Sequence, residues 1–329
     1  MCLVEMSEFT NVFIFVSDAL RYGYVPQELE ERADSSVIRT LAPSHHSAKS
    51  FASLLSGLSP ENHGVGHFGD KLEEDHILEF FPNSDLWDHK DSSVRFMLDL
   101  VERQDINEME EPFIWVERGL ETHVPYRDQG HNKQLSEEHS DWRGGRYYFD
   151  NFENDGELRD KYNAAAQDAV DHFQRHVNYL RREDMLEDTL VIFTSDHGDI
   201  LGERVFGRKR YGHNVPASSY ISEVPTVFFN YDVGVDRIRS IDIVPTVLGI
   251  LDMSWCMETD GNDVRVDKPK KGKCPTAPYI FDLEWIWDES LQRWKMTRET
   301  LIKSIIEDHV PEKFFRKIGR EVKTIDFSD

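Results

Sequence analysis

Thr189-Leu-Val-Ile-Phe-Thr-Ser-Asp196-His197-Gly198-Asp199 is the stretch from which the fold can be inferred. Its first six residues are apolar or β-branched without a regular polar alternation, which is typical of a strand buried on both faces of a parallel sheet. Open α/β sheets bind ligands beyond the carboxyl ends of their strands, and Asp and His side chains are good ligands for divalent metals. We therefore expect a functional site where this strand ends.

A second strand of the same kind supports this expectation. Asn11-Val-Phe-Ile-Phe-Val-Ser-Asp18 is another continuous apolar run that ends in a carboxylate. Taken alone, Asp-His-Gly is equally compatible with a polar turn that closes a strand. If the two strands lie side by side, however, Asp18, Asp196 and His197 point to one place. This convergence is our working hypothesis.

Strand and helix patterns alternate through the rest of the chain. Strands are expected over 35–41, 111–117 and 223–230, and helices from Ser47 and over 158–182 and 241–251. Loops are expected over 60–112, 127–157 and 202–219. In the tail we expect an aromatic strand pair (279–287 and 294–296) followed by a charged helix from Thr297. This alternation predicts an α/β fold with a doubly wound, mostly parallel sheet.

The charge of the chain limits its partners. Its 329 residues include 62 acidic and 38 basic side chains, for a net charge of −24. Such a surface argues against nucleic-acid binding, which needs a basic face, and against docking on anionic lipid. The acidic excess also suits a protein kept soluble at high salt, so an acidic proteome, such as that of a halophilic archaeon, is a hypothesis for its source.

Cysteine usage and the absence of apolar segments indicate the compartment. Three cysteines, Cys2, Cys256 and Cys274, match neither a disulfide framework nor a zinc site. The amino terminus has no signal-peptide pattern, and no apolar run approaches the ~18 residues that span a bilayer. We expect a soluble, cytoplasmic protein; the sequence leaves its oligomeric state open.

Ser47 is the candidate nucleophile. It begins a helical pattern that ends at Gly57, and a serine in that position is most often a simple cap. The same position presents backbone N–H groups and the positive end of the helix dipole, which stabilise a sulfate, a phosphate or a developing oxyanion. A hydroxyl bound to a metal also loses its proton more readily. Lys49, His45 and His46 are candidates for binding the anion or protonating a leaving group, although each alone is more often solvated.

Several segments, in order, resemble sulfatases of the alkaline phosphatase superfamily. They are Val-Ser-Asp18-Ala-Leu-Arg21, residues 47–65, Thr122-His123-Val-Pro-Tyr126, residues 189–203 and Asp242-Ile-Val-Pro-Thr246. The resemblance implies an alkaline-phosphatase-like α/β/α sandwich with a mostly parallel central sheet and a small C-terminal subdomain. On this basis we divide the chain into a sulfatase-like catalytic domain over 8–255 and a C-terminal loop, short strands and helix over 256–329.

The resemblance, with the local chemistry around Ser47, implies roles for ten residues. They are the ligands of one divalent metal (Asp18, Ser47, Asp196 and His197), the catalytic residues (Ser47 as covalent nucleophile, with His123, His213 and Lys49), and the substrate-binding residues (Arg21, His46 and Lys209).

Two departures from the family pattern refine this expectation. Sulfatases that convert a Cys or Ser to formylglycine usually carry Pro two residues later and Arg four residues later, where this chain has Lys49 and Phe51. We therefore expect Ser47 to act as an unmodified hydroxyl, without formylglycine. Ala19 stands where many sulfatases have a second Asp, so the metal loses one carboxylate. This disfavours calcium, which prefers more oxygens, but leaves calcium, manganese, magnesium and zinc all open.

The resulting hypothesis is a metal-dependent hydrolase that cleaves a small anionic ester. Sulfate ester hydrolysis is the first reading, and phosphomonoester or phosphodiester cleavage is the alternative within the same superfamily. A catalytically silent binding domain that kept the fold is the alternative of another class. The alcohol of the substrate is not identified, because residues 65–110 and 127–157 match no motif.

Overall fold

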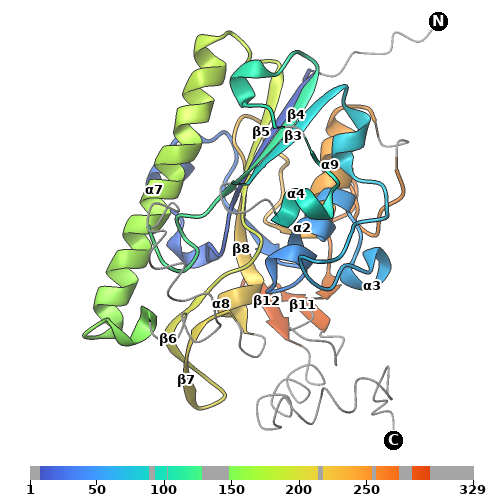
Figure 1. Ribbon diagram of the computed structural model, residues 1–329. Coiled ribbons are helices and arrows are strands. Elements are labelled where there is room, and N and C mark those ends of the chain that lie inside the picture. Colours follow the sequence, from blue (N-terminus) through green and yellow to red (C-terminus); the bar gives the residue numbers. More distant parts are fainter. Residues whose placement is uncertain are drawn as a thin grey trace, which may run out of the picture.

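The computed structural model describes residues 8–88, 93–101, 103–127, 148–213, 218–253, 257–273 and 284–296. Their centre is a seven-stranded sheet in the order β3-β4-β1-β5-β8-β2-β9, with helices on both faces (Figure 1). The strands are β1 (Asn11–Ser17), β2 (Ile38–Leu41), β3 (Asn83–Asp88), β4 (Phe113–Gly119), β5 (Thr189–Thr194), β8 (Glu223–Phe228) and β9 (Arg237–Arg239).

Strand β1 lies in the interior of the sheet, parallel to β4 on one side and to β5 on the other. Every residue of these three strands is buried, which explains why β1 and β5 are continuously apolar. Strand β8 runs antiparallel to both of its neighbours, β5 and β2, while β9 is parallel to β2 and β3 to β4. The expected α/β fold with a mostly parallel sheet is thus confirmed.

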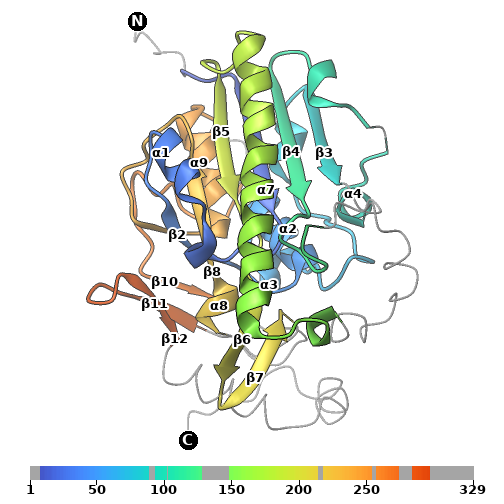
Figure 2. The same cartoon turned by 90° about the vertical axis from the view of Figure 1, so that its left-hand side faces the viewer.

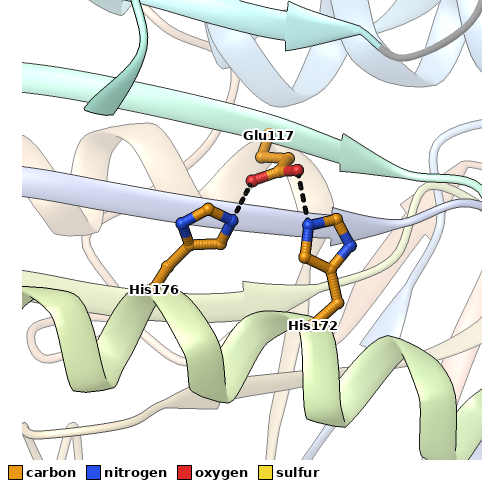
Figure 3. Close-up of side chains that lie close together, drawn as sticks. All are labelled: Glu117, His172 and His176. Atoms are coloured by element: carbon orange, nitrogen blue, oxygen red, sulfur yellow. Dashed lines mark ion pairs between the residues drawn. The ribbon is translucent and has the colours of Figure 1, made fainter. Parts of the chain in front are cut away.

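The two faces of the sheet carry different helices (Figure 2). One face is covered by α7 (Asp155–Arg182), whose apolar side packs on Phe13 and Phe15 of β1. The helix begins at its N-cap Asn154, whose side chain accepts hydrogen bonds from the backbone N–H groups of Gly156 and Glu157. Near its middle it places two histidines against β4 (Figure 3).

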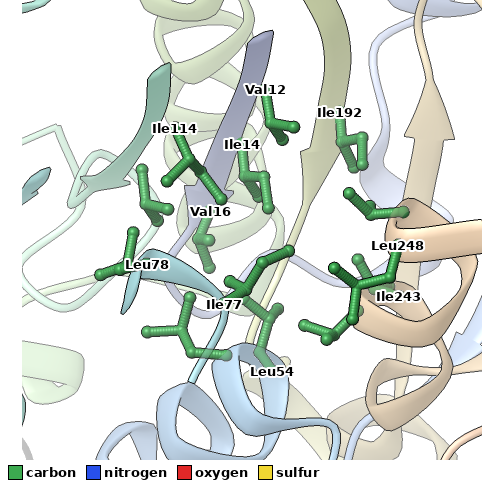
Figure 4. Close-up of a cluster of buried hydrophobic side chains, with 14 of the residues drawn as sticks. Val12, Ile14, Val16, Leu54, Ile77, Leu78, Ile114, Ile192, Ile243 and Leu248 are labelled. Carbon is green, nitrogen blue, oxygen red and sulfur yellow. The ribbon is translucent and has the colours of Figure 1, made fainter. Parts of the chain in front are cut away.

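The other face is covered by α2 (Ser47–Ser56), α4 (Ser93–Met97) and α9 (Ile243–Ile250). Their apolar side chains form one core with Val12, Ile14 and Val16 of β1 (Figure 4). Because side chains alternate across a strand, β1 supplies both cores at once. This packing fixes the position of α2 over the carboxyl ends of the central strands.

Short elements connect this framework. They are η1 (Tyr22–Tyr24), α1 (Gln27–Arg32), α3 (Pro60–His63), η2 (Ile77–Phe80), η3 (Ile106–Glu108), α8 (Ser219–Ser222) and η4 (Ser240–Asp242), the hairpin strands β6 (Ile200–Val205) and β7 (Arg208–Gly212), and the small antiparallel sheet of β10 (Lys271–Lys273), β11 (Glu284–Asp288) and β12 (Arg293–Met296). None of the helices in the described residues is long and apolar enough to cross a membrane.

Two expected loops contain regular structure. The stretch 60–112 includes the edge strand β3, whose polar sequence Asn-Ser-Asp-Leu-Trp-Asp gives little strand signal. The stretch 202–219 includes most of the β6–β7 hairpin, which is too basic to read as a buried strand. The helix expected from Thr297 and most of the expected loop 127–157 lie outside the described residues. The division of the chain at residue 255 stays a prediction.

Candidate active site

The predicted convergence of two carboxylate-tipped strands occurs at the carboxyl end of β1. In the register of the sheet, Val16 of β1 lies beside Thr194 of β5, so the residues that follow leave the sheet together. The backbone N–H of Ala19 donates to Asp196 Oδ1 at 3.0 Å, which ties the two strand ends to each other. Ala19 has a left-handed backbone (φ 68°) that turns the chain away beyond this contact.

Three carboxylate and hydroxyl oxygens surround one ring nitrogen, His197 Nε2. Asp196 Oδ2 lies 3.5 Å from it, Asp18 Oδ1 lies 3.8 Å from it, and Ser47 Oγ lies 3.2 Å from it. The other ring nitrogen, Nδ1, lies 3.1 Å from the carbonyl oxygen of Gly198. A carbonyl only accepts, so Nδ1 donates to it, and in the neutral ring the lone pair of Nε2 faces the three oxygens.

This cluster has the features of a cation site. Asp18, Asp196 and His197 are at most 1% exposed, and their candidate ligand atoms lie within 4.8 Å of one another. Among the described residues, Asp18 Oδ1 and Asp196 Oδ2 are buried without a hydrogen-bond partner. Buried oxygens that lack partners are costly unless a cation binds them. The residues present therefore fit a divalent metal held by two carboxylates and an imidazole.

Arg118 of β4 is a further part of this site, and the sequence did not indicate it. Its guanidinium donates to Asp18 Oδ2 from Nε at 2.8 Å and from Nη2 at 2.6 Å, and its Nη1 lies 3.4 Å from both carboxylate oxygens of Asp88. The arginine occupies one oxygen of Asp18 and leaves the other directed at the cation site. The available signal was a charged residue near the end of a strand that begins with a continuous apolar run.

The electrostatics of the two carboxylates differ. Burial acts to raise the pKa of Asp18, but the nearby Arg118, His123 and His197 outweigh it and hold this pKa below its usual range. Burial, reinforced by the negative charge of Asp18, raises the pKa of Asp196 above its usual value. The anionic form of Asp196 is thus unfavourable until a positive charge arrives.

His213 is held by a second carboxylate beside this cluster. Its Nδ1 donates to Asp199 Oδ1 at 2.7 Å, and Asp199 Oδ2 accepts the hydroxyl of Tyr126 at 2.7 Å. The ring of His213 lies 4.4 Å from that of His197 and 5.6 Å from that of His123, centroid to centroid. Burial acts to lower the pKa of His213, but Asp199 outweighs it and raises the pKa above its ordinary value. Asp199 and Tyr126 were quoted within motifs of the sequence but not assigned a role.

The start of α2 and the residue before it carry three of the expected site residues. Ser47 is the first residue of the helix, and its hydroxyl faces His197. His46 and Lys49 flank it. Burial lowers the pKa of His46 to about 4 and also lowers that of Lys49. His46 is therefore uncharged at neutral pH. It would contact an anion through a hydrogen bond from its ring N–H and not through a positive charge.

Two expected substrate-binding residues form ion pairs with carboxylates outside the cluster. The Lys209 ammonium, half exposed, pairs with Asp155 at the start of α7 at 2.8 Å. Lys209 lies on β7, and this strand of the β6–β7 hairpin extends away from His213. The hairpin therefore brings Lys209 to Asp155. Arg21 pairs with Glu203 at 2.8 Å and lies over the rings of Tyr24 and Tyr220.

Gly198 permits the close approach of two loops at this site. Its N–H donates to the carbonyl of Ile221 at 2.8 Å, and a Cβ at this position would lie 2.3 Å from the carbonyl oxygen of Tyr220. We expect Gly198→Ala to lower the free energy of unfolding by about 1–3 kcal/mol, because the backbone must shift to make room. Chemical denaturation measures this change. Gly23→Ala is the matched control, since a Cβ there meets nothing within 4 Å; equal losses in both variants would contradict the argument.

A protein-family model described as sulfatase matches residues 70–253. The chain is 30% identical over 283 residues to the low-salt glycan biosynthesis sulfotransferase Agl7 of Haloferax volcanii, covering 81% of this chain and 67% of that protein.

Solved structures share the fold. A Bacteroides thetaiotaomicron protein described with that bacterium's metabolism of glycosaminoglycans superposes with a TM-score of 0.59 at 12% identity, over 95% of this chain and 94% of its own. The phosphonate monoester hydrolase of Agrobacterium radiobacter gives a TM-score of 0.58 at 13% identity, over 94% and 93%. The expected α/β fold is thus shared with these structures.

Proposed function

The chain belongs to the sulfatase family, and from this premise we propose that it is a metal-dependent hydrolase that cleaves a sulfate ester with Ser47 as its covalent nucleophile. The observation that supports the proposal is the position of Ser47 Oγ, 3.2 Å from His197 Nε2. The same nitrogen lies within 3.8 Å of the partnerless oxygens of Asp18 and Asp196. A nucleophile and a cation site thus share one point.

In the proposed reaction, the Ser47 hydroxyl releases its proton to solvent, its Oγ attacks the sulfur atom, and the bond from sulfur to the ester oxygen breaks. The departing alcohol takes a proton from His213 or His123, which lie next to each other. A water molecule then attacks the sulfate ester of Ser47, which releases sulfate and restores the hydroxyl. Asp18, Asp196 and His197 would hold a divalent metal, which would lower the pKa of the Ser47 hydroxyl and supply positive charge to the non-bridging oxygens.

One metal ion fits the active site better than two. Asp199 lies close enough to His197 and His213 to be considered as a ligand of a second ion. Its two oxygens, however, already accept hydrogen bonds from His213 and Tyr126. We therefore assign Asp199 to the orientation of His213 and not to metal binding. The assay described below tests whether the ion is calcium, manganese, magnesium or zinc.

The pH dependence of the reaction tests the role of His213. A general acid must hold its proton, so kcat/KM is expected to fall as pH rises through the raised pKa of His213. Asp199→Asn removes the negative charge and keeps an acceptor for Nδ1, so this alkaline limb should move to lower pH by about one unit. Tyr126→Phe is the control, because it removes one hydrogen bond of Asp199 and leaves its charge. An alkaline limb that does not move in Asp199→Asn would exclude His213 as the titrating acid.

Transfer to an acceptor is a second candidate function. The relative from Haloferax volcanii is named as a glycan biosynthesis sulfotransferase. A sulfate ester on Ser47 is open to attack by a sugar hydroxyl as well as by water, and the residues on the protein side would be the same. Cleavage of a phosphate or phosphonate monoester, in place of a sulfate ester, is the alternative for the type of substrate.

One assay separates these functions. Nitrophenyl sulfate, nitrophenyl phosphate and nitrophenyl phenylphosphonate are each tested with each of the four metals, with and without a sugar acceptor. The release of nitrophenol and of inorganic sulfate is measured. We expect nitrophenyl sulfate to be cleaved best, with equal release of the two products in water. If less inorganic sulfate than nitrophenol is released when the sugar is present, the sulfate group has been transferred to the sugar. No turnover of any ester with any metal would favour the silent binding domain.

The proposal extends to the setting of the enzyme. We assign catalysis to residues 8–255 and a packing role to 256–329, with an unmodified Ser47 in place of formylglycine. We propose a cytoplasmic enzyme that acts on a small anionic ester. The net charge of −24 supports an acidic proteome as its source and the absence of a nucleic-acid or lipid partner.

A further inference from the structure

A second group of metal-ligating side chains lies between β4 and α7 (Figure 3). Glu117 of β4 points one carboxylate oxygen at each of two histidines of the helix. Its Oε1 lies 2.9 Å from His172 Nε2, and its Oε2 lies 2.7 Å from His176 Nε2. The candidate ligand atoms all lie within 4.8 Å of one another.

The spacing and burial of these residues suit a metal. His172 and His176 are four positions apart on α7, so they project from one face of the helix, as paired zinc-binding histidines do. Glu117 is 1% exposed, and the two histidine side chains are 10% and 19% exposed. Two imidazoles and one carboxylate are a donor set that zinc accepts, with a fourth position left for water.

The orientation of the two rings adds an independent observation. His172 Nδ1 lies 2.7 Å from Glu121 Oε1, and metal-bound histidines commonly donate their other N–H to a carboxylate in this way. His176 Nε2 makes no aligned hydrogen bond within the described residues although Glu117 Oε2 is 2.7 Å away. A carboxylate oxygen beside the axis of a ring nitrogen is the arrangement of two ligands that share an ion. Phe13 and Trp115 pack against the His176 ring and hold it in place.

This group is separate from the proposed active site. Side chains of neighbouring strand residues point to opposite faces of a sheet. Arg118 therefore reaches Asp18 on one side, while Glu117 reaches α7 on the other. An ion held by Glu117 and α7 would join the long helix to the centre of the sheet without touching the substrate.

We propose that Glu117, His172 and His176 form a structural zinc site that fastens α7 to β4, with Glu121 as the carboxylate that orients His172. The competing description is an ion-pair network without metal, in which His172 carries a proton between Glu117 and Glu121. The two descriptions differ in zinc binding, which is measured directly.

The test uses the full chain, stripped with a chelator and titrated with zinc chloride by calorimetry. The protein carries Asp196→Asn, so that binding at the active site is weakened and the remaining signal reports the second site. We expect one zinc ion per chain and a melting temperature that rises by several degrees at saturation. Adding Glu121→Gln should weaken zinc binding about 10–100-fold, and adding His176→Gln should weaken it further.

His67→Gln is the matched control, since it removes an exposed histidine that pairs with Asp70 outside the group; zinc affinity should not change. Crystals of the unaltered protein soaked in zinc chloride provide a measurement that needs no variant. An anomalous peak between the three ligand atoms supports the proposal. No zinc uptake by the Asp196→Asn protein, an affinity that His176→Gln does not change, or no peak at this position would overturn it.

Discussion

Ser47→Ala is expected to lower kcat for ester cleavage by about 10⁴- to 10⁶-fold, the range seen when a covalent nucleophile is removed. The hydroxyl faces His197 and does not cap the helix, so the variant should fold and melt close to the unaltered protein. Metal binding, measured by calorimetry, should persist because Asp18, Asp196 and His197 remain. The measurement is single-turnover kinetics with nitrophenyl sulfate.

Ser50→Ala is the matched control for this experiment. Ser50 is a buried serine of the same helix, and its hydroxyl donates to the carbonyl of Ser44 at 3.1 Å. Loss of this hydrogen bond should lower the free energy of unfolding by about 1 kcal/mol and leave kcat within a few-fold of that of the unaltered enzyme. Activity of Ser47→Ala within tenfold of the unaltered enzyme would exclude the nucleophile. Mass spectrometry of the purified chain also checks that Ser47 is an unmodified serine.

Asp196→Asn is expected to have the second-largest effect, on metal binding and on stability in opposite directions. Asp196 Oδ1 accepts from Ala19 and His197, and an amide oxygen preserves both bonds. The change falls on the partnerless Oδ2, which becomes an NH₂ group that cannot bind a cation. Metal affinity at this site and activity should each fall by at least about 100-fold, because a direct ligand matters more than a residue behind it.

Without metal, Asp196→Asn should melt at a higher temperature than the unaltered protein. Burial and the charge of Asp18 raise the pKa of Asp196, so its anionic form destabilises the folded state at neutral pH, and the amide removes that charge. The control is Asp70→Asn on the surface. A hydrogen bond from the backbone of Gly66 lowers the pKa of Asp70, so its neutralisation should lower stability slightly. A fall in melting temperature for metal-free Asp196→Asn would contradict the electrostatic argument.

Residues whose positions follow from the strands themselves were predictable. Continuous apolar runs predicted β1 and β5, and the residue after each run had to leave the sheet at its carboxyl edge. Asp18, Asp196 and His197 meet there for that reason, and Ser47 joins them because α2 packs over the same edge. The edge strand β3 was missed because an edge strand needs less apolar sequence than a central one.

Residues whose partners come from other strands were not predictable. Arg118 is one charged residue among several in its stretch, and only the register of β4 against β1 brings it to Asp18. The pairing of Asp199 with His213 likewise depends on how the β6–β7 hairpin folds back. Lys209 illustrates the reverse case, since the same hairpin carries it to Asp155 and away from the cluster.

The sequence by itself determined the α/β fold and the set of groups at the ends of its two central strands, because apolar runs and their polar ends are local properties of the chain. Only the tertiary structure decided which charges face one another. Arg118 behind Asp18, Asp199 behind His213 and Glu117 opposite His172 depend on strand register and helix packing. These are non-local, because they are set by contacts between segments distant along the chain.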